Sequence, residues 1–178
     1  MYRTIDIILS IIGLAIGIPL ILIVCFLQSK PIYIQQRVGR HQRLFHLIKL
    51  RTMHIATKTA PSHMVEGKKI TKLGKFLRSS KIDEIPQLIN VLKGDMSLVG
   101  PRPCLPTQHE LITYRAEKNI FSVRPGITGL SQVRGIDMST PKELANSDYE
   151  MLRNFSIKMY IYCILNTFRK KALTDRVR

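Results

Sequence analysis

The sequence predicts a helix-rich α+β protein, with an N-terminal membrane helix at residues 1–29 and one small domain at residues 30–178. Three observations support this prediction. A long apolar segment lies near the N-terminus, several segments with helix start and stop signals follow it, and only short segments have the composition of strands. The length of 178 residues suits one domain plus an anchor. The three scattered cysteines are expected to be reduced thiols.

The apolar segment covers residues 7–27 and contains no charged side chain. As a helix it would be ~32 Å long, which is enough to cross the hydrocarbon core of a bilayer. Pro19 lies inside the segment and predicts a kink, and Arg3 and Lys30 flank its two ends. Because basic flanks prefer the cytoplasmic side, these residues favour a re-entrant helix, although they also allow a kinked spanning helix.

The first half of the domain combines strands with a helical region. Residues 32–35 and 44–50 have the composition of strands, and residues 56–69 lack any periodicity and predict a loop. Residues 70–92 have a helical pattern in two pieces. Gly94 follows a basic last turn, which is typical of a helix C-terminus.

The second half of the domain is mainly helical. Sequences typical of capping boxes begin at Thr107 and Thr140 and predict two helices, with turns between them at residues 124–126 and 128–129. Residues 157–168 predict a last apolar, aromatic helix. This helix is expected either in the core or on a membrane surface.

The chain is strongly basic, with a formal net charge of +16 from 28 Lys and Arg against 12 Asp and Glu. Thirteen of the basic residues lie between positions 30 and 81, where Glu66 is the only acid. Such a field predicts an anionic partner: nucleic acid, anionic lipid or a phosphorylated substrate. No Trp is present and few aromatic residues accompany the basic ones, so a nucleic-acid partner is not expected.

Asp83 and Glu84 form the first acidic pair after this basic stretch. One interpretation is helix capping, because acids in a first turn complement the helix dipole. The other is chemical. A helix N-terminus surrounded by cations binds phosphate, and a carboxylate placed there can hold Mg²⁺ or attack a phosphorus atom. The pair alone does not decide between them.

Arg102 stands between Pro101 and Pro103. The two prolines stiffen the backbone, so the guanidinium would be well placed for bidentate phosphate binding. A structural Pro-Arg-Pro turn explains the same residues equally well. Lys49 and Arg124 likewise stand beside hydroxyl or turn-forming residues.

These segments occur together in an order that resembles the bacterial sugar transferase family, in its smallest form, the monotopic phosphoglycosyl transferases. The resemblance covers nearly the whole chain. The motifs that carry it are Gln36-Arg37-Val38-Gly39, Lys49-Leu50-Arg51-Thr52-Met53, Ile70-Thr71-Lys72-Leu73-Gly74 with Leu77-Arg78, Asp83-Glu84-Ile85-Pro86-Gln87-Leu88, and the segments 94–103 and 124–132.

The resemblance implies a covalent mechanism. Asp83 would attack the sugar-bearing phosphorus of a UDP-sugar and release UMP, and undecaprenyl phosphate would then take the sugar-1-phosphate from the aspartyl intermediate. This is the first membrane step in the synthesis of a bacterial polysaccharide or glycoprotein glycan. Mg²⁺ would be held by Asp83 and Glu84, with assistance to the acceptor as an alternative role for Glu84.

The resemblance also implies a set of residues that bind the phosphates and the nucleotide. Arg78 and Arg102 match positions that face phosphate, and Lys49 and Arg51 match supporting positions. The remaining binding residues are expected in the last motif, at Arg124 and Gln132.

Members of this family carry a re-entrant helix broken at a proline, so the resemblance favours a monotopic anchor at Pro19. A cytoplasmic catalytic domain with interfacial amphipathic helices would then lie on the cytoplasmic face of the bacterial inner membrane, against anionic headgroups. A homodimer is left open. Neither the sugar nor the pathway is predicted.

Five residues depart from the family pattern. Lys81 stands where a small hydroxyl residue is usual, and Leu50 replaces a common Phe. Arg134 and Ile136 replace a frequent Asn and a frequent basic residue, which would alter contacts with the nucleotide or sugar. Tyr160 replaces a common Asp, so an ion pair expected there would be absent.

Two other classes of protein explain part of the sequence. A membrane-tethered nucleic-acid binder accounts for the anchor and the charge. A non-catalytic module on a lipid surface accounts for the same two features but gives Asp83 and Glu84 no role. The transferase interpretation explains all of these features together with the order of the motifs.

Overall fold

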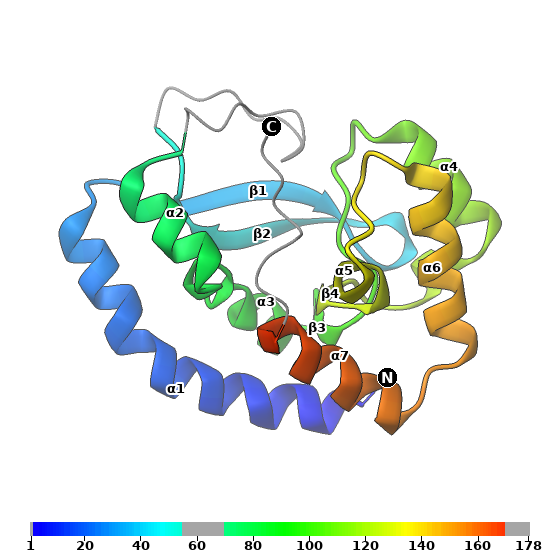
Figure 1. Cartoon of the computed structure of the whole chain (residues 1–178), viewed down its shortest axis with the longest axis horizontal. Coiled ribbons are helices and arrows are strands. Elements are labelled where there is room, and N and C mark those ends of the chain that lie inside the picture. The colour runs from blue at the N-terminus through cyan, green and yellow to red at the C-terminus, as the bar shows by residue number, and fades with distance from the viewer. Residues whose placement is uncertain (1, 55–69, 170–178) are drawn as a thin grey trace.

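The computed structural model describes residues 2–54 and 70–169. A long helix, α1 (Arg3–Leu27), runs along one side of a small domain, and helix α7 (Ile157–Arg169) lies beside its N-terminal end (Figure 1). The other helices and strands are β1 (Ile32–Val38), β2 (Leu44–Leu50), α2 (Lys72–Ser79), α3 (Gln87–Lys93), β3 (Ser97–Val99), α4 (His109–Glu117), β4 (Gly126–Thr128), α5 (Leu130–Arg134) and α6 (Pro141–Arg153). Short 3-10 turns lie at η1 (Arg40–Gln42), η4 (Ile82–Glu84) and η5 (Ile120–Ser122). The predicted helix-rich α+β class is confirmed.

The two predicted strands are present and pair with each other. β1 and β2 are antiparallel, with Ile32 opposite Leu50 and Val38 opposite Leu44. The side chains alternate, so the middle of the hairpin buries one face and exposes the other, whereas Val38 and Leu50 at the ends of the second face are also buried. The loop predicted at residues 56–69 lies outside the described residues.

The helical region at 70–92 has the predicted two pieces. Thr71 caps α2 by accepting a hydrogen bond of 2.9 Å from the amide of Gly74. The chain then turns at Lys81, whose φ of 62° is left-handed, and passes through η4 into α3. Gly94, with φ of 91°, ends α3 as predicted.

Two local predictions are wrong. Gly126–Thr128 forms strand β4, parallel to β3, where turns were predicted on both sides of Ile127. The pairing needs very close approach, because a Cβ on Gly126 would lie 2.1 Å from the amide nitrogen of Gly100. The predicted capping bonds are also absent. The N-cap residue of α4 is Gln108 rather than Thr107, and the side chain of Gln108 makes no capping hydrogen bond. Thr140 is the N-cap residue of α6, but its side chain makes no capping hydrogen bond either.

Helix α1 is continuous through Pro19 and curves along the domain (Figure 1). Its length and composition are those of a helix that can cross a membrane. Near its N-terminal end, Asp6 is buried and accepts hydrogen bonds from Ser97, Leu98 and Tyr160.

Near its C-terminal end, Val24 packs with Leu50 and Leu77 in one core cluster. Between the two ends the helix lies close to the domain, since a Cβ on Gly17 would lie 2.5 Å from a methyl group of Ile85. Both ends of α1 are therefore attached to the same domain.

Helices α1 and α7 also present apolar side chains outward. The exposed residues include Ile8, Ile11, Ile16, Leu22 and Phe26 on α1, and Ile157, Ile161 and Leu165 on α7. On the opposite side of α7, Tyr160 and Cys163 are buried in the core. The last helix is thus both a core element and an apolar surface.

Candidate active site

Asp83 lies in the short turn η4, between α2 and α3, and is only 6% exposed. The left-handed Lys81 reverses the chain just before it. The backbone of Lys81 donates a hydrogen bond to the carbonyl of Arg78 and accepts one from the amide of Glu84. These bonds fix the acidic pair at the point where two helices meet.

Five of the residues predicted for the site line one cavity. They are Lys49 from β2, Arg78 from α2, Asp83 and Glu84 from η4, and Arg102 from the segment after β3. The rest of the lining consists of Arg37, Leu47, Gln87, Pro103, Gly126 and Ile127. The cavity thus combines two carboxylates with four cationic side chains.

Two of these cations have N–H groups that remain unsatisfied. Arg78 donates from Nε to Thr52 at 2.9 Å, while its Nη1 is buried without a partner among the described residues. Arg37 donates to the carbonyl of Pro103 at 3.0 Å and to Gln35 at 2.6 Å, but its buried Nε has no partner in that part of the chain. Buried N–H donors without an acceptor favour the binding of an anionic ligand.

The cations also perturb one another. Burial and then the neighbouring Arg37 lower the pKa of Lys49 to about 8, whereas Asp83 acts in the opposite direction. Burial and then Arg102 lower the pKa of Arg37 to about 10. Crowded cations of this kind are stabilised when an anion such as a diphosphate enters.

Arg102 is held through its backbone by a buried network. Arg115 of α4, only 2% exposed, donates from Nη1 to the carbonyl of Arg102 at 2.8 Å. Its Nε donates to Asp148 of α6 at 3.0 Å, and Asp148 accepts a further hydrogen bond from Ser131 of α5. Three helices therefore position the Pro-Arg-Pro segment at the cavity.

Three residues predicted for the site do not line this cavity. Arg51 donates to the carbonyl of Lys30 and stacks over the Tyr33 ring at 5.2 Å. Arg124 donates to the carbonyl of Gly94 at 2.7 Å, and Gln132 donates to the carbonyl of Ile127 at 2.8 Å. All three side chains therefore bind backbone carbonyls. Gln132 binds that of Ile127, which lines the cavity.

Arg37 was missed as an individual site residue, although it belongs to one of the motifs. The strand register contains the signal. Arg37 lies opposite Phe45, Gln35 opposite Leu47 and Tyr33 opposite Lys49, so all six side chains share one face of the hairpin. The predicted strand ended at residue 35, so Arg37 was grouped with Lys49 only once the structure gave the longer strand and its register.

The two carboxylates fit a magnesium ion better than a closed metal site. Within residues 2–54 and 70–169, no group of three or more His, Cys, Asp or Glu side chains is arranged to hold a metal. Mg²⁺ is commonly held by one or two carboxylates, with water and substrate phosphates completing its shell. Asp83 and Glu84 are suitable as such a pair.

The residues that depart from the family pattern have defined places. Arg134 forms an exposed ion pair with Glu150, away from the cavity lining. Ile136 packs against a core cluster. The hydroxyl of Tyr160 donates a hydrogen bond to the buried carboxylate of Asp6.

Comparison with known proteins gives a consistent set of relatives. The family model for bacterial sugar transferases matches residues 1–174. The chain is 38% identical to the galactosyl transferase CpsE of Streptococcus agalactiae, over 94% of this chain and 41% of that protein. It is 32% identical to the UDP-glucose:undecaprenyl-phosphate glucose-1-phosphate transferase of Caulobacter vibrioides, over 97% of this chain and 70% of the relative.

A further relative, from Aeromonas hydrophila, is a UDP-N-acetylgalactosamine-undecaprenyl-phosphate N-acetylgalactosaminephosphotransferase. It is 32% identical over 94% of this chain and 42% of its own length. The chain therefore spans only about two fifths of two of these three relatives, at 41% and 42%.

Proposed function

The chain belongs to the bacterial sugar transferase family, and we propose on this basis that it transfers a sugar-1-phosphate from a UDP-sugar to undecaprenyl phosphate. The reaction would be the first membrane step of a bacterial glycoconjugate pathway. The names of the relatives from Caulobacter and Aeromonas support this proposal, because both contain a UDP-sugar and undecaprenyl phosphate.

One observation carries the proposal. The buried Asp83 and its neighbour Glu84 share a cavity with Arg37, Lys49, Arg78 and Arg102. Four cations, two of them with unsatisfied buried donors, suit a diphosphate. The membrane helix lies against the same region, since Gly17 of α1 contacts Ile85, two residues after Asp83.

The proposed chemistry has two displacements. A carboxylate oxygen of Asp83 attacks the sugar-bearing phosphorus, the bond from that phosphorus to the bridging oxygen breaks, and UMP leaves. A phosphate oxygen of undecaprenyl phosphate then attacks the same phosphorus. The bond to Asp83 breaks, the carboxylate is regenerated and a lipid diphosphate sugar is formed.

The cations and the metal have separate roles in this proposal. Arg37, Arg78 and Arg102 orient the diphosphate and stabilise the charge that develops on the UMP leaving group. Asp83 and Glu84 would hold Mg²⁺, which when bound reduces the repulsion between the anionic carboxylate and the anionic phosphorus centre. Lys49 adds positive charge beside Asp83.

The topology of α1 supports a position on one face of the membrane. A helix that crossed the bilayer would have its two ends on opposite sides. Here Asp6 and Val24, near opposite ends of α1, both contact the same domain. We therefore propose a monotopic, re-entrant anchor, with the domain on the cytoplasmic face of the inner membrane.

The activity is tested with the full chain in detergent, undecaprenyl phosphate and Mg²⁺. UDP-glucose, UDP-galactose and UDP-N-acetylgalactosamine form the first panel, since the names of the relatives differ in the sugar. We expect lipid-dependent release of UMP from one of them or from a related UDP-sugar. Absence of UMP release across a broad panel of UDP-sugars would contradict the proposal.

A further inference from the structure

A second cavity of about 400 Å³ lies between the membrane helix and the domain. Leu9, Ile12 and Gly13 of α1 form one wall, and Ile164 and Thr167 of α7 form another. Most of the remaining lining is apolar and comes from Ile85, Leu88, Leu98 and Ile127, with Thr128 as a polar addition. The cavity reaches the apolar surface of α1, because Leu9 and Ile12 are 40% and 51% exposed.

One end of this cavity is polar and adjoins the catalytic cavity. Glu84 and Ile127 line both cavities, so the two share a wall. Ser80 and Lys81 lie at the same end. The backbone of Lys81 is bonded to Arg78 and Glu84, which both line the catalytic cavity.

Lys81 is the only cation in this lining among the described residues. No hydrogen bond or ion pair joins its ammonium group to any other side chain in that part of the chain. It also holds a left-handed conformation, with φ of 62°, which fixes the direction in which its side chain leaves the backbone. A cation in this position can accept an anionic group at the boundary of an apolar space.

We propose that this second cavity, the acceptor cavity, binds the phosphate-proximal isoprene units of the polyprenol phosphate, and that Lys81 binds its phosphate. This rests on the proposed function. A dry cavity of about 150 Å³ holds one benzene ring, so a cavity of this size suits roughly two or three isoprene units by the same scale. The shared wall at Glu84 then delivers the acceptor phosphate to the phosphorus held beside Asp83.

Lys81 gives this chain a cation at the boundary between the apolar cavity and the catalytic cavity. A phosphate without an isoprenoid tail lacks the apolar contacts, and a neutral polyprenol lacks the contact with Lys81. Both parts of the lipid contribute to recognition.

The direct test is photolabelling of the full chain in detergent with a polyprenyl phosphate that carries a diazirine on its first isoprene units. We expect labelled peptides that contain residues 9–13 of α1 or 164–167 of α7, and competition by unlabelled polyprenyl phosphate. Labels confined to other parts of the chain would overturn the proposal. Equal competition by an ordinary phospholipid would also overturn it, because the cavity would then hold bulk membrane lipid.

Variants that fill the cavity sharpen this test. Ile164→Trp should reduce the labelling at least fivefold, whereas Ile161→Trp, on the exposed side of the same helix, should leave it within twofold. A second pair avoids any dependence on how α7 packs. Ile12 lines the cavity, whereas Ile16, which is 70% exposed, does not. Ile12→Trp should therefore reduce the labelling and Ile16→Trp should not. Equal labelling within both pairs would contradict the proposal.

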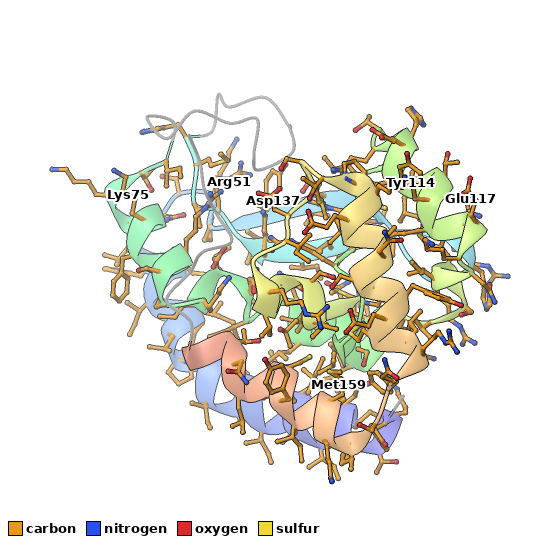
Figure 2. The ribbon with its side chains drawn as sticks, turned by 45° about the vertical axis from the view of Figure 1, so that its right-hand side comes forward. Arg51, Lys75, Tyr114, Glu117, Asp137 and Met159 are labelled. Carbon is orange, nitrogen blue, oxygen red and sulfur yellow. The ribbon has the colours of Figure 1, made fainter. Side chains whose placement is uncertain are left out.

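The role of Lys81 is tested by Lys81→Met, with Lys75→Met as the control. Lys75 extends away from the domain on α2 (Figure 2). Lys81→Met should raise the KM for polyprenyl phosphate about tenfold and leave the KM for UDP-sugar within twofold, and Lys81→Arg should restore the first value. An unchanged KM for the lipid would exclude Lys81 as its phosphate ligand.

These outcomes separate the proposal from the function on which it rests. Specific labelling in the acceptor cavity without transfer from any UDP-sugar would leave the cavity as a lipid site and remove the transferase function. Transfer with labelling elsewhere would keep the function and remove the acceptor cavity.

Discussion

Tyr160 of α7 donates a hydrogen bond of 2.7 Å to Asp6 of α1, joining two buried side chains that lie 154 positions apart in the chain. Ser97 and the amide of Leu98 donate to the same carboxylate. Helix α1 is thereby bonded to the domain at its N-terminal end by polar contacts as well as by apolar packing.

Tyr160→Phe removes one donor from this buried carboxylate. We expect the free energy of unfolding to fall by about 1.5–3 kcal/mol, because a hydrogen bond to a charged group is lost without creating a cavity. Tyr162→Phe, at an exposed position on the same helix, is the matched control. Denaturation of the detergent-solubilised chain measures both. A loss below about 0.5 kcal/mol for Tyr160→Phe, in the range of ordinary surface changes, would show that the bond is not important.

Lys49 predicts a pH dependence. Its pKa of about 8 means that the ammonium is charged below this pH and becomes neutral above it. The cavity then loses positive charge, so we expect kcat/KM for the UDP-sugar to fall as the pH rises through about 8. Lys49→Arg keeps its charge throughout and should remove this fall, whereas Lys75→Arg should retain it. The same alkaline fall in Lys49→Arg would assign the titration to another group.

The anchor is predicted to enter and leave the membrane on the cytoplasmic side. Cysteines are introduced singly at Tyr2 and Lys30, with Cys25 replaced by serine and the fully buried Cys104 and Cys163 retained. A membrane-impermeant maleimide should label both sites in inverted vesicles and neither site in intact spheroplasts. Lysed membranes control for reactivity. Labelling of residue 2 from the periplasmic side would establish a spanning helix.

Activity is predicted to require a divalent cation. Exhaustive chelation should abolish the release of UMP, and Mg²⁺ should restore it, because oxygen ligands from Asp83, Glu84 and the diphosphate suit this ion. A chelator already saturated with Mg²⁺ is the control for other effects of the reagent. Full turnover after chelation would remove the metal role given to the two carboxylates.

Local sequence patterns were sufficient to predict the helices and strands that depend mainly on neighbouring residues in the chain. The two strands β1 and β2 follow from side-chain composition, although their pairing was not predicted, and the end of α3 follows from Gly94 after a basic turn. The pair β3–β4 was not predicted. Each strand has three residues, and their pairing depends on a close contact between Gly100 and Gly126 that no local pattern contains.

The individual patterns around Asp83, Glu84 and Arg102 left a structural and a chemical interpretation open, and the order of the motifs made these residues site candidates. The structure places them in one cavity. The same resemblance was a poorer guide to Arg51 and Arg124, because their guanidinium groups donate hydrogen bonds to backbone carbonyls. The acceptor cavity could not be predicted, since its walls come from five separate parts of the chain.

The covalent role of Asp83 is the central claim, and exchange of labelled UMP into UDP-sugar tests it most directly. The assay contains the full chain, Mg²⁺, the UDP-sugar and labelled UMP, without any polyprenyl phosphate. If Asp83 forms an aspartyl phospho-sugar, the first displacement is reversible by itself, so label should enter the UDP-sugar. Asp83→Asn should reduce this exchange to background. Active enzyme that transfers sugar phosphate to lipid yet shows no exchange without lipid would contradict the covalent mechanism.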